Sequence, residues 1–172
     1  TAMGTQQTPP NLVLVGMALI LTLFTMTPTI NAIKESAYDP YKEGRITQEE
    51  CFERVQEPLK EYMLNQMQIS SMELYCNMTD TPIPQSQDEA RELPMTVIMP
   101  AYVTSELKHA FIIGFLLYIP FLLIDIIVSS TLMSMGMVML PPSMISTPFK
   151  ILLFILLDGW QLLFSTLVGM IR

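Results

Sequence analysis

Residues 110–128 read AFIIGFLLYIPFLLIDIIV, an apolar stretch in which Asp125 is the one charged side chain. Two further apolar stretches lie before and after it, NLVLVGMALILTLFTMTPTI at residues 11–30 and ILLFILLDGWQLLFSTLVGM at residues 151–170. Because about 20 helical residues cross a hydrocarbon core roughly 30 Å thick, each stretch is long enough to span a bilayer. The sequence therefore predicts an all-α membrane protein.

Polar side chains interrupt the second and third apolar stretches. Asp125, Asp158 and Gln161 would each be costly against lipid, with about 2.5 to 3.5 kcal/mol for a central Asp. Pro120 removes a backbone hydrogen bond and is expected to kink its helix. These exceptions predict long, kinked helical hairpins that pack against other protein surfaces rather than isolated spans.

The charge of the chain is concentrated in one region. Residues 31–108 contain fourteen Asp or Glu against seven Lys or Arg, and the rest of the chain contains two acidic and two basic residues. This balance argues against a nucleic-acid partner, because phosphate binding needs clustered Lys and Arg. We interpret the region as an acidic, mostly helical insertion between the first and second apolar helices.

Local patterns predict helices inside this acidic region. Thr47 and Glu50 form the TxxE pattern of a capping box, and apolar residues follow at helical spacing. This predicts an amphipathic helix that bends near Pro58. A second short helix is expected over residues 71–77, followed by an extended, proline-rich connector at residues 79–94.

Both cysteines, Cys51 and Cys76, lie in the acidic region. In an oxidising compartment they could form a disulfide worth about 3 kcal/mol, or they could be two buried thiols, and the spacing does not decide between these. The sequence has no motif typical of a zinc site or a serine hydrolase, and His109 is its only histidine. We therefore expect no cofactor, no metal and no enzymatic activity.

The stretch between the second and third apolar helices, residues 133–149, is uncharged. It contains four methionines that alternate with other residues, Met133, Met135, Met137 and Met139. Alternation is the period of a strand or a loop rather than of a helix. One interpretation is a flexible apolar connector in which Met fills gaps. The other is that several copies around an axis bring soft thioethers together and close a pore.

A specific family resemblance covers most of the chain. It is carried by SELKHAFIIGFLLYIPFLLIDIIVSSTLMSMGMVMLPPSMISTPFKILLFILLDGW at residues 105–160, GTQQTPPN at residues 4–11 and VQEPLKEYMLNQ at residues 55–66. These motifs closely resemble the FliP family, core subunits of the flagellar type III protein-export gate. Related injectisome proteins tend to have VSP in place of residues 140–142 and often lack the DGW of residues 158–160, so the flagellar branch is favoured.

The resemblance implies a ring of several copies, a pentamer, in the bacterial inner membrane at the flagellar basal body. FliQ-like and FliR-like subunits would join the ring, and FlhB-like and FlhA-like export proteins would work with it. Unfolded flagellar proteins would pass through, driven by energy supplied elsewhere. The family's methionine gasket falls on Met137, Val138 and Met139, where Val138 replaces the usual third methionine but keeps the constriction apolar.

Lys150 begins an apolar helix and is expected to need an acidic partner. The candidates in a buried charge network are Glu106, Asp125 and Asp158, and the resemblance favours Glu106. Removing one partner of a buried pair costs roughly 3 to 5 kcal/mol. The alternative is that Lys150 extends to water and Glu106 is solvated.

Two rival functions stay open at this point. The first is an ion- or proton-translocating subunit in which Asp125 and Asp158 act as relay groups. The second is a structural scaffold whose methionine loop is filler.

We divide the chain into a linker at residues 1–11, apolar helices at 12–30 and 109–132, the acidic region at 31–108, a methionine-rich gate loop at 133–149 and an apolar C-terminal helix at 150–172. Members of the resembled family have a further apolar helix, and usually a signal peptide, upstream of the position where this chain starts. A longer gene product is therefore expected, with the acidic region outside the cytoplasm. The positive charges that flank the acidic region would instead favour a cytoplasmic location, but long loops are translocated largely regardless of charge.

Overall fold

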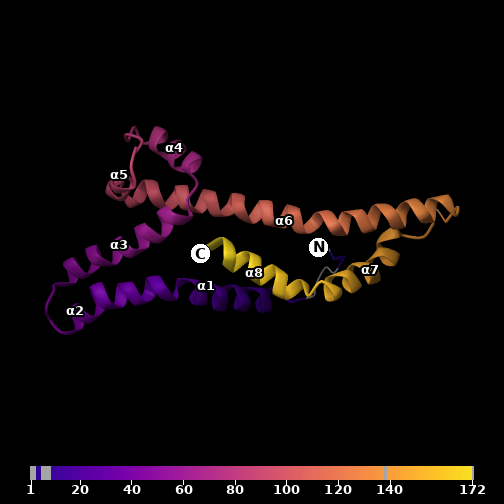
Figure 1. Ribbon diagram of the computed structural model, residues 1–172, viewed down its shortest axis with the longest axis horizontal. Coiled ribbons are helices and arrows are strands. Elements are labelled where there is room, and N and C mark those ends of the chain that lie inside the picture. The colour runs from indigo at the N-terminus through magenta and orange to yellow at the C-terminus, as the bar shows by residue number, and fades with distance from the viewer. Residues whose placement is uncertain (1–2, 5–8, 138, 172) are drawn as a thin grey trace. The chain divides into compact units, whose positions relative to one another are not determined.

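The computed structural model describes residues 3–4, 9–137 and 139–171, with Met170 and Ile171 as backbone. Throughout these residues the regular structure is helical and no strand occurs (Figure 1). The elements in chain order are α1 (Asn11–Ile33), the π-helix η1 (Lys34–Tyr38), α2 (Asp39–Lys42), α3 (Gln48–Gln66), α4 (Ile69–Met78), α5 (Gln87–Glu92), α6 (Met95–Ser134), α7 (Pro142–Leu156) and α8 (Gly159–Ile171).

The chain divides into two compact units, residues 23–110 and residues 1–22 together with 111–172. Among the described residues, two helical stretches are long and apolar enough to cross a membrane, Asn11–Lys42 and Met95–Ser134. Helices α7 and α8 together could supply a third crossing, bent by 62° at the break between them. The predicted class, an all-α membrane protein, is confirmed.

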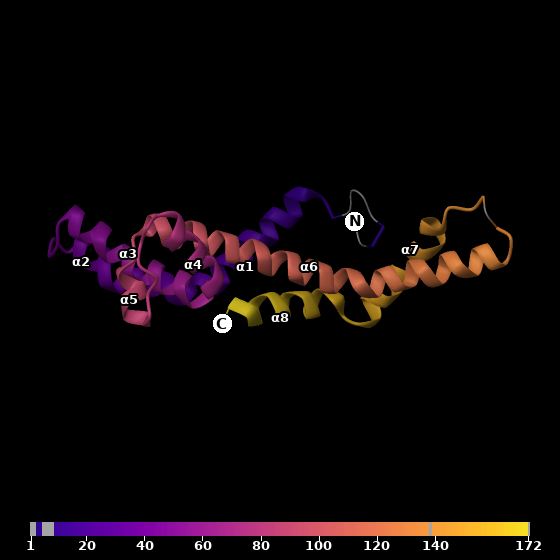
Figure 2. The same cartoon turned by 90° about the horizontal axis from the view of Figure 1, so that it is seen from above.

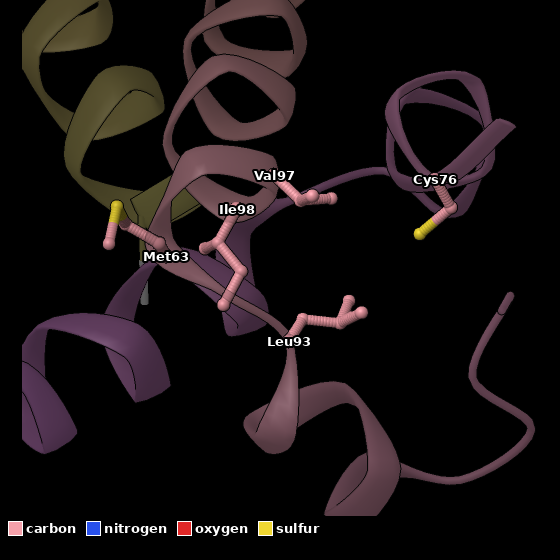
Figure 3. Close-up of a cluster of buried hydrophobic side chains, with 5 residues drawn as sticks. All are labelled: Met63, Cys76, Leu93, Val97 and Ile98. Carbon is pink, nitrogen blue, oxygen red and sulfur yellow. The ribbon is translucent and has the colours of Figure 1, made fainter. Parts of the chain in front are cut away.

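A small apolar core organises residues 23–110. In both views α3, α4 and α5 gather around the start of α6 (Figures 1 and 2). Figure 3 shows the buried side chains that hold them there, which are Met63, Cys76, Leu93, Val97 and Ile98. Polar contacts add to this small core, because Gln68 and Tyr75 also form hydrogen bonds to α6.

Helix starts in this unit follow local capping chemistry. Thr47 Oγ1 accepts a hydrogen bond from the Glu50 backbone N–H over 3.2 Å, and Glu50 Oε2 accepts one from the Thr47 N–H over 2.9 Å. The predicted capping box is confirmed, and α3 continues through Pro58. The predicted second helix is α4. The connector, however, is not wholly extended, because Ser86 Oγ accepts from the Glu89 N–H and begins α5.

Helix α6 begins much earlier than the predicted start at residue 109. It starts at Met95, directly after Pro94, whose carbonyl accepts the first helical hydrogen bond from the Val97 N–H over 2.9 Å. Residues 95–103 are mostly apolar, and Val97 and Ile98 in the first turn are buried in the core, which stabilises this early start of the helix. The helix also continues through Pro120 without interruption.

The second unit contains a helical hairpin made by the end of α6 and by α7, which folds back along it (Figures 1 and 2). Helix α6 ends in a Schellman motif, with the Met137 N–H donating to the Leu132 carbonyl over 3.0 Å and Gly136 at φ 76°. The next helix begins at Pro142. The loop predicted over residues 133–149 is thus shortened to residues 135–141, because α7 starts before Lys150.

Candidate functional site

A buried ion pair joins the two arms of the hairpin. Lys150 Nζ on α7 donates to Asp125 Oδ2 on α6 over 2.6 Å, and Ser146 Oγ, one turn earlier on α7, donates to Asp125 Oδ1 over 2.6 Å. The Lys150 side chain is 6% exposed and that of Asp125 is 31% exposed, while Ser146 is fully buried. Charge-assisted hydrogen bonds of this kind are short and strong. Both oxygens of Asp125 are therefore bound to α7.

Asp125 is one of the three candidate partners of Lys150, whereas the family resemblance favours Glu106. Glu106 belongs to the other unit, and its Oε1 lies 3.4 Å from His109 Nδ1. Asp158 is an exposed residue just beyond the end of α7. Lys150 is nearly buried, so it does not extend to water either. Within the hairpin Lys150 pairs with Asp125, and a pairing of Glu106 with Lys150 stays a prediction.

The ion pair lies well below the loop of the hairpin. Asp125 is nine residues before the end of α6, and Lys150 is eight residues after the start of α7. At about 1.5 Å of rise per residue, the pair is roughly 12 to 14 Å from either end of the loop. The ion pair thus fixes the spacing of the arms and leaves the loop projecting beyond it.

The methionines of the loop are exposed. Met139 is 99% exposed and Met137 is 45% exposed, while Val138 lies outside the described residues. Met133 and Met135 are also exposed. A methionine that fills a gap would be buried against its own chain. Met139 fills no gap of this kind, and its side chain is available to other surfaces.

A sharp corner divides the predicted C-terminal helix of residues 150–172 into α7 and α8. Asp158 adopts a left-handed conformation with φ 52°, which ends α7. Gly159 is buried, and a Cβ there would overlap the ring of Phe154. Trp160 packs edge-on against Phe154, with ring centroids 5.3 Å apart, and stacks on Phe164 at 5.9 Å. The DGW motif therefore builds a fixed bend.

The two cysteines are free thiols in the structure. Cys51 is half-buried, and its Sγ donates a weak hydrogen bond to the Ala37 carbonyl over 3.7 Å. Cys76 is fully buried in the core of residues 23–110, and this burial raises the pKa of its thiol. The alternative of two largely buried thiols fits the structure, and a disulfide in an oxidising compartment stays a prediction.

The hairpin, its exposed methionines and the DGW corner coincide with the segment that carries the family resemblance. The family model described as "FliP family" matches residues 1–167. The chain belongs to the FliP family. Its relatives include the flagellar biosynthetic protein FliP of Pectobacterium carotovorum, which is 47% identical over 96% of this chain and 63% of the relative. The corresponding FliP proteins of Bacillus subtilis and Aquifex aeolicus are each 46% identical, over 98% and 97% of this chain and 75% and 70% of the relatives. This FliP-family chain thus spans only part of the length of these relatives.

One residue of the FliP-family hairpin was missed by sequence reasoning. Ser146 had been placed in a loop, although it stands four residues before Lys150. That spacing places both side chains on one face of a helix. This four-residue spacing would have indicated Ser146 as a neighbour of Lys150 if the helix had been predicted to begin at Pro142.

Proposed function

We propose that this chain is a core subunit of the flagellar type III protein-export gate, in which several copies surround a channel for unfolded flagellar proteins. The name "flagellar biosynthetic protein FliP" of the relatives supports the flagellar over the injectisome alternative. Its role would be passage and sealing, with no chemical reaction performed by the chain.

The observation that carries this proposal is an exposed methionine loop on a hairpin whose arms are held together. Lys150 and Ser146 bind both oxygens of Asp125, so the arms keep a fixed spacing below the loop. The Met139 side chain is almost wholly uncovered by its own chain, and about half of Met137 is uncovered. Unbranched thioethers adapt easily to neighbouring surfaces. A ring of such loops could close on itself and still yield to a passing polypeptide.

Apolar surface left uncovered by the chain supports assembly into a ring. Helix α1 has no buried residue, although its sequence is almost entirely apolar. Monomeric soluble proteins rarely expose apolar patches larger than a few hundred Å², and larger ones mark membrane or protein contacts. We assign this surface to neighbouring copies in a pentamer, to FliQ-like and FliR-like subunits and to lipid of the bacterial inner membrane. FlhB-like and FlhA-like proteins would complete the export apparatus in the flagellar basal body.

The sealing role is tested by conductance. The complex assembled with the full-length protein is placed in a planar bilayer, and the double variant Met137→Ala, Met139→Ala is compared with Met133→Ala, Met135→Ala. Each variant removes two thioethers, but only the first shortens the proposed seal. We expect the first variant to raise ion conductance while flagellar export continues, and the second to conduct like the unaltered complex. Equal conductance of the two variants would count against the seal and favour the scaffold alternative.

A further inference from the structure

Gln68 attaches the joint between α3 and α4 to α6 through three polar contacts. Its backbone N–H donates to Ser105 Oγ over 3.0 Å. Its side-chain Oε1 accepts from Lys108 Nζ over 2.8 Å, and its Nε2 lies 2.9 Å from His109 Nε2. The three partners occupy just over one turn of α6, immediately before its apolar stretch begins at residue 110. One uncharged side chain thus joins two neighbouring titratable groups of α6 to the joint.

The contacts of Gln68 fix the protonation of the imidazole. A lysine ammonium has only hydrogens to donate, so the amide oxygen of Gln68 must face Lys108. The amide nitrogen, which can only donate, then faces His109, and Nε2 of the ring must accept. The ring hydrogen is therefore on Nδ1, directed toward Glu106 Oε1 at 3.4 Å. The arrangement requires a neutral His109.

A second proton on His109 would make this arrangement impossible. Both ring nitrogens would then donate, and Nε2 would meet the donating amide nitrogen of Gln68. Turning the amide around would satisfy the imidazolium, but it would present the amide hydrogens to the Lys108 ammonium. Gln68 can serve one of the two groups but not both.

We propose that Gln68, Lys108 and His109 form a proton-sensitive latch, which holds the α3–α4 joint on α6 while His109 is neutral and loosens it when His109 is protonated. Histidine is the side chain that ordinarily changes charge between pH 5 and 8. Acidification of the compartment that the acidic region faces would then release one of the two side-chain contacts. The Ser105 contact and the apolar core would keep the joint from detaching completely.

Other groups around the latch are compatible with this switch. On α6, the charged neighbours of His109 are Glu106, whose Oε1 lies 3.4 Å from Nδ1, and Lys108, which shares Gln68 with it. The packed elements bring two phenols to this part of α6, and the charged side chains of Glu61 on α3 and Arg91 on α5 line the same pocket as Gln68. Tyr75 of α4 bonds to Thr104, and Tyr62 of α3 packs edge-on against a tyrosine ring of α6. Among these residue types, histidine is the one that ordinarily changes charge between pH 5 and 8.

Hydrogen exchange measured by mass spectrometry tests the latch in the full-length protein in detergent. Protection factors, corrected for the intrinsic effect of pH, are compared at about pH 8 and about pH 5.5, on either side of the ordinary histidine range. Because one hydrogen bond is lost, protection of residues 67–76 should fall roughly twofold to tenfold at the lower pH. Peptides from the first turns of α3, which do not touch Gln68, should keep their protection.

Two variants distinguish the latch from general acid loosening. In His109→Gln the new amide oxygen can accept from Gln68 but does not titrate, so the pH effect on residues 67–76 should disappear. In Lys108→Met, Gln68 is able to turn toward a protonated ring, and the effect should shrink below about twofold. Unchanged protection in the unaltered protein, or the same fall in His109→Gln, would overturn the proposal. If a variant does not fold, the pH dependence of protection in the unaltered protein still tests the proposal.

Discussion

Replacing Asp125 with Leu should destabilise the protein more than replacing Lys150 with Met, although both changes break the same ion pair. The reason is the unequal burial of the two partners. The Lys150 side chain is 6% exposed, so without Asp125 its charge is left buried and unpaired. The Asp125 side chain is 31% exposed and keeps its bond from Ser146, so without Lys150 it remains partly hydrated and bonded.

The magnitudes follow from this difference. An uncompensated buried charge costs roughly 3 to 5 kcal/mol, which we expect for Asp125→Leu. Loss of a hydrogen bond to a charged group costs about 1.5 to 3 kcal/mol, which we expect for Lys150→Met. The double variant leaves neither charge behind, and Ser146 retains a longer bond to the Ser143 carbonyl. Its free energy of unfolding should therefore lie within about 1 kcal/mol of that of the unaltered protein, because replacing a buried ion pair with apolar residues is often close to neutral.

The assay is denaturant unfolding of the purified full-length protein in detergent, with the two single variants and the double variant measured as a cycle. Glu106→Gln serves as a control, because the Glu106 carboxylate lies beside His109 and takes no part in the Asp125–Lys150 pair. We expect that change to cost less than about 1 kcal/mol. Lys150→Met costing as much as Asp125→Leu, or a double variant as unstable as the sum of the singles, would refute the reasoning.

Three further predictions concern other parts of the chain. Gly159→Ala should cost about 1 to 3 kcal/mol in the same unfolding assay, because its Cβ would overlap a phenylalanine ring, and an unaffected variant would contradict this packing. Cys76 should react with a maleimide more slowly than Cys51 and speed up only as pH rises beyond the ordinary thiol range, because burial raises the pKa of Cys76; equal rates by mass spectrometry would argue against its burial. If copies pair through Glu106 and Lys150, the exchange Glu106→Lys with Lys150→Glu should restore export that each single change abolishes, and no rescue in an exchange variant that still folds without its Asp125 pair would count against that pairing.

Local patterns in the sequence predicted what local chemistry decides. The TxxE motif located the start of α3, because Thr47 and Glu50 satisfy each other's backbone groups without help from distant residues. The apolar stretches predicted the membrane class, because the length of an apolar stretch can be read directly from the sequence and compared with the thickness of a bilayer. The alternation of methionines also indicated a loop, and the described part of residues 135–141 contains no helix or strand.

Tertiary contacts decided what the sequence did not predict. The start of α6 lies inside the acidic region, and it is helical because Val97 and Ile98 are buried with residues of α3 and α4. The pairing of Lys150 with Asp125 depends on how α6 and α7 lie side by side, which no spacing rule gives. The corner at Asp158 was hidden inside an apolar run, although an Asp-Gly pair is a recognised turn signal.

The central claim is that copies of this chain place Met137 and Met139 on the axis of a channel. A density map of the closed complex, purified with its companion subunits and full-length protein, tests it most directly. The account predicts that the loops from all copies meet at the axis, with these two thioethers closing it and the Asp125–Lys150 pair holding the hairpin arms behind them. An axis closed by other residues, with the methionine loops turned toward lipid or solvent, would contradict it.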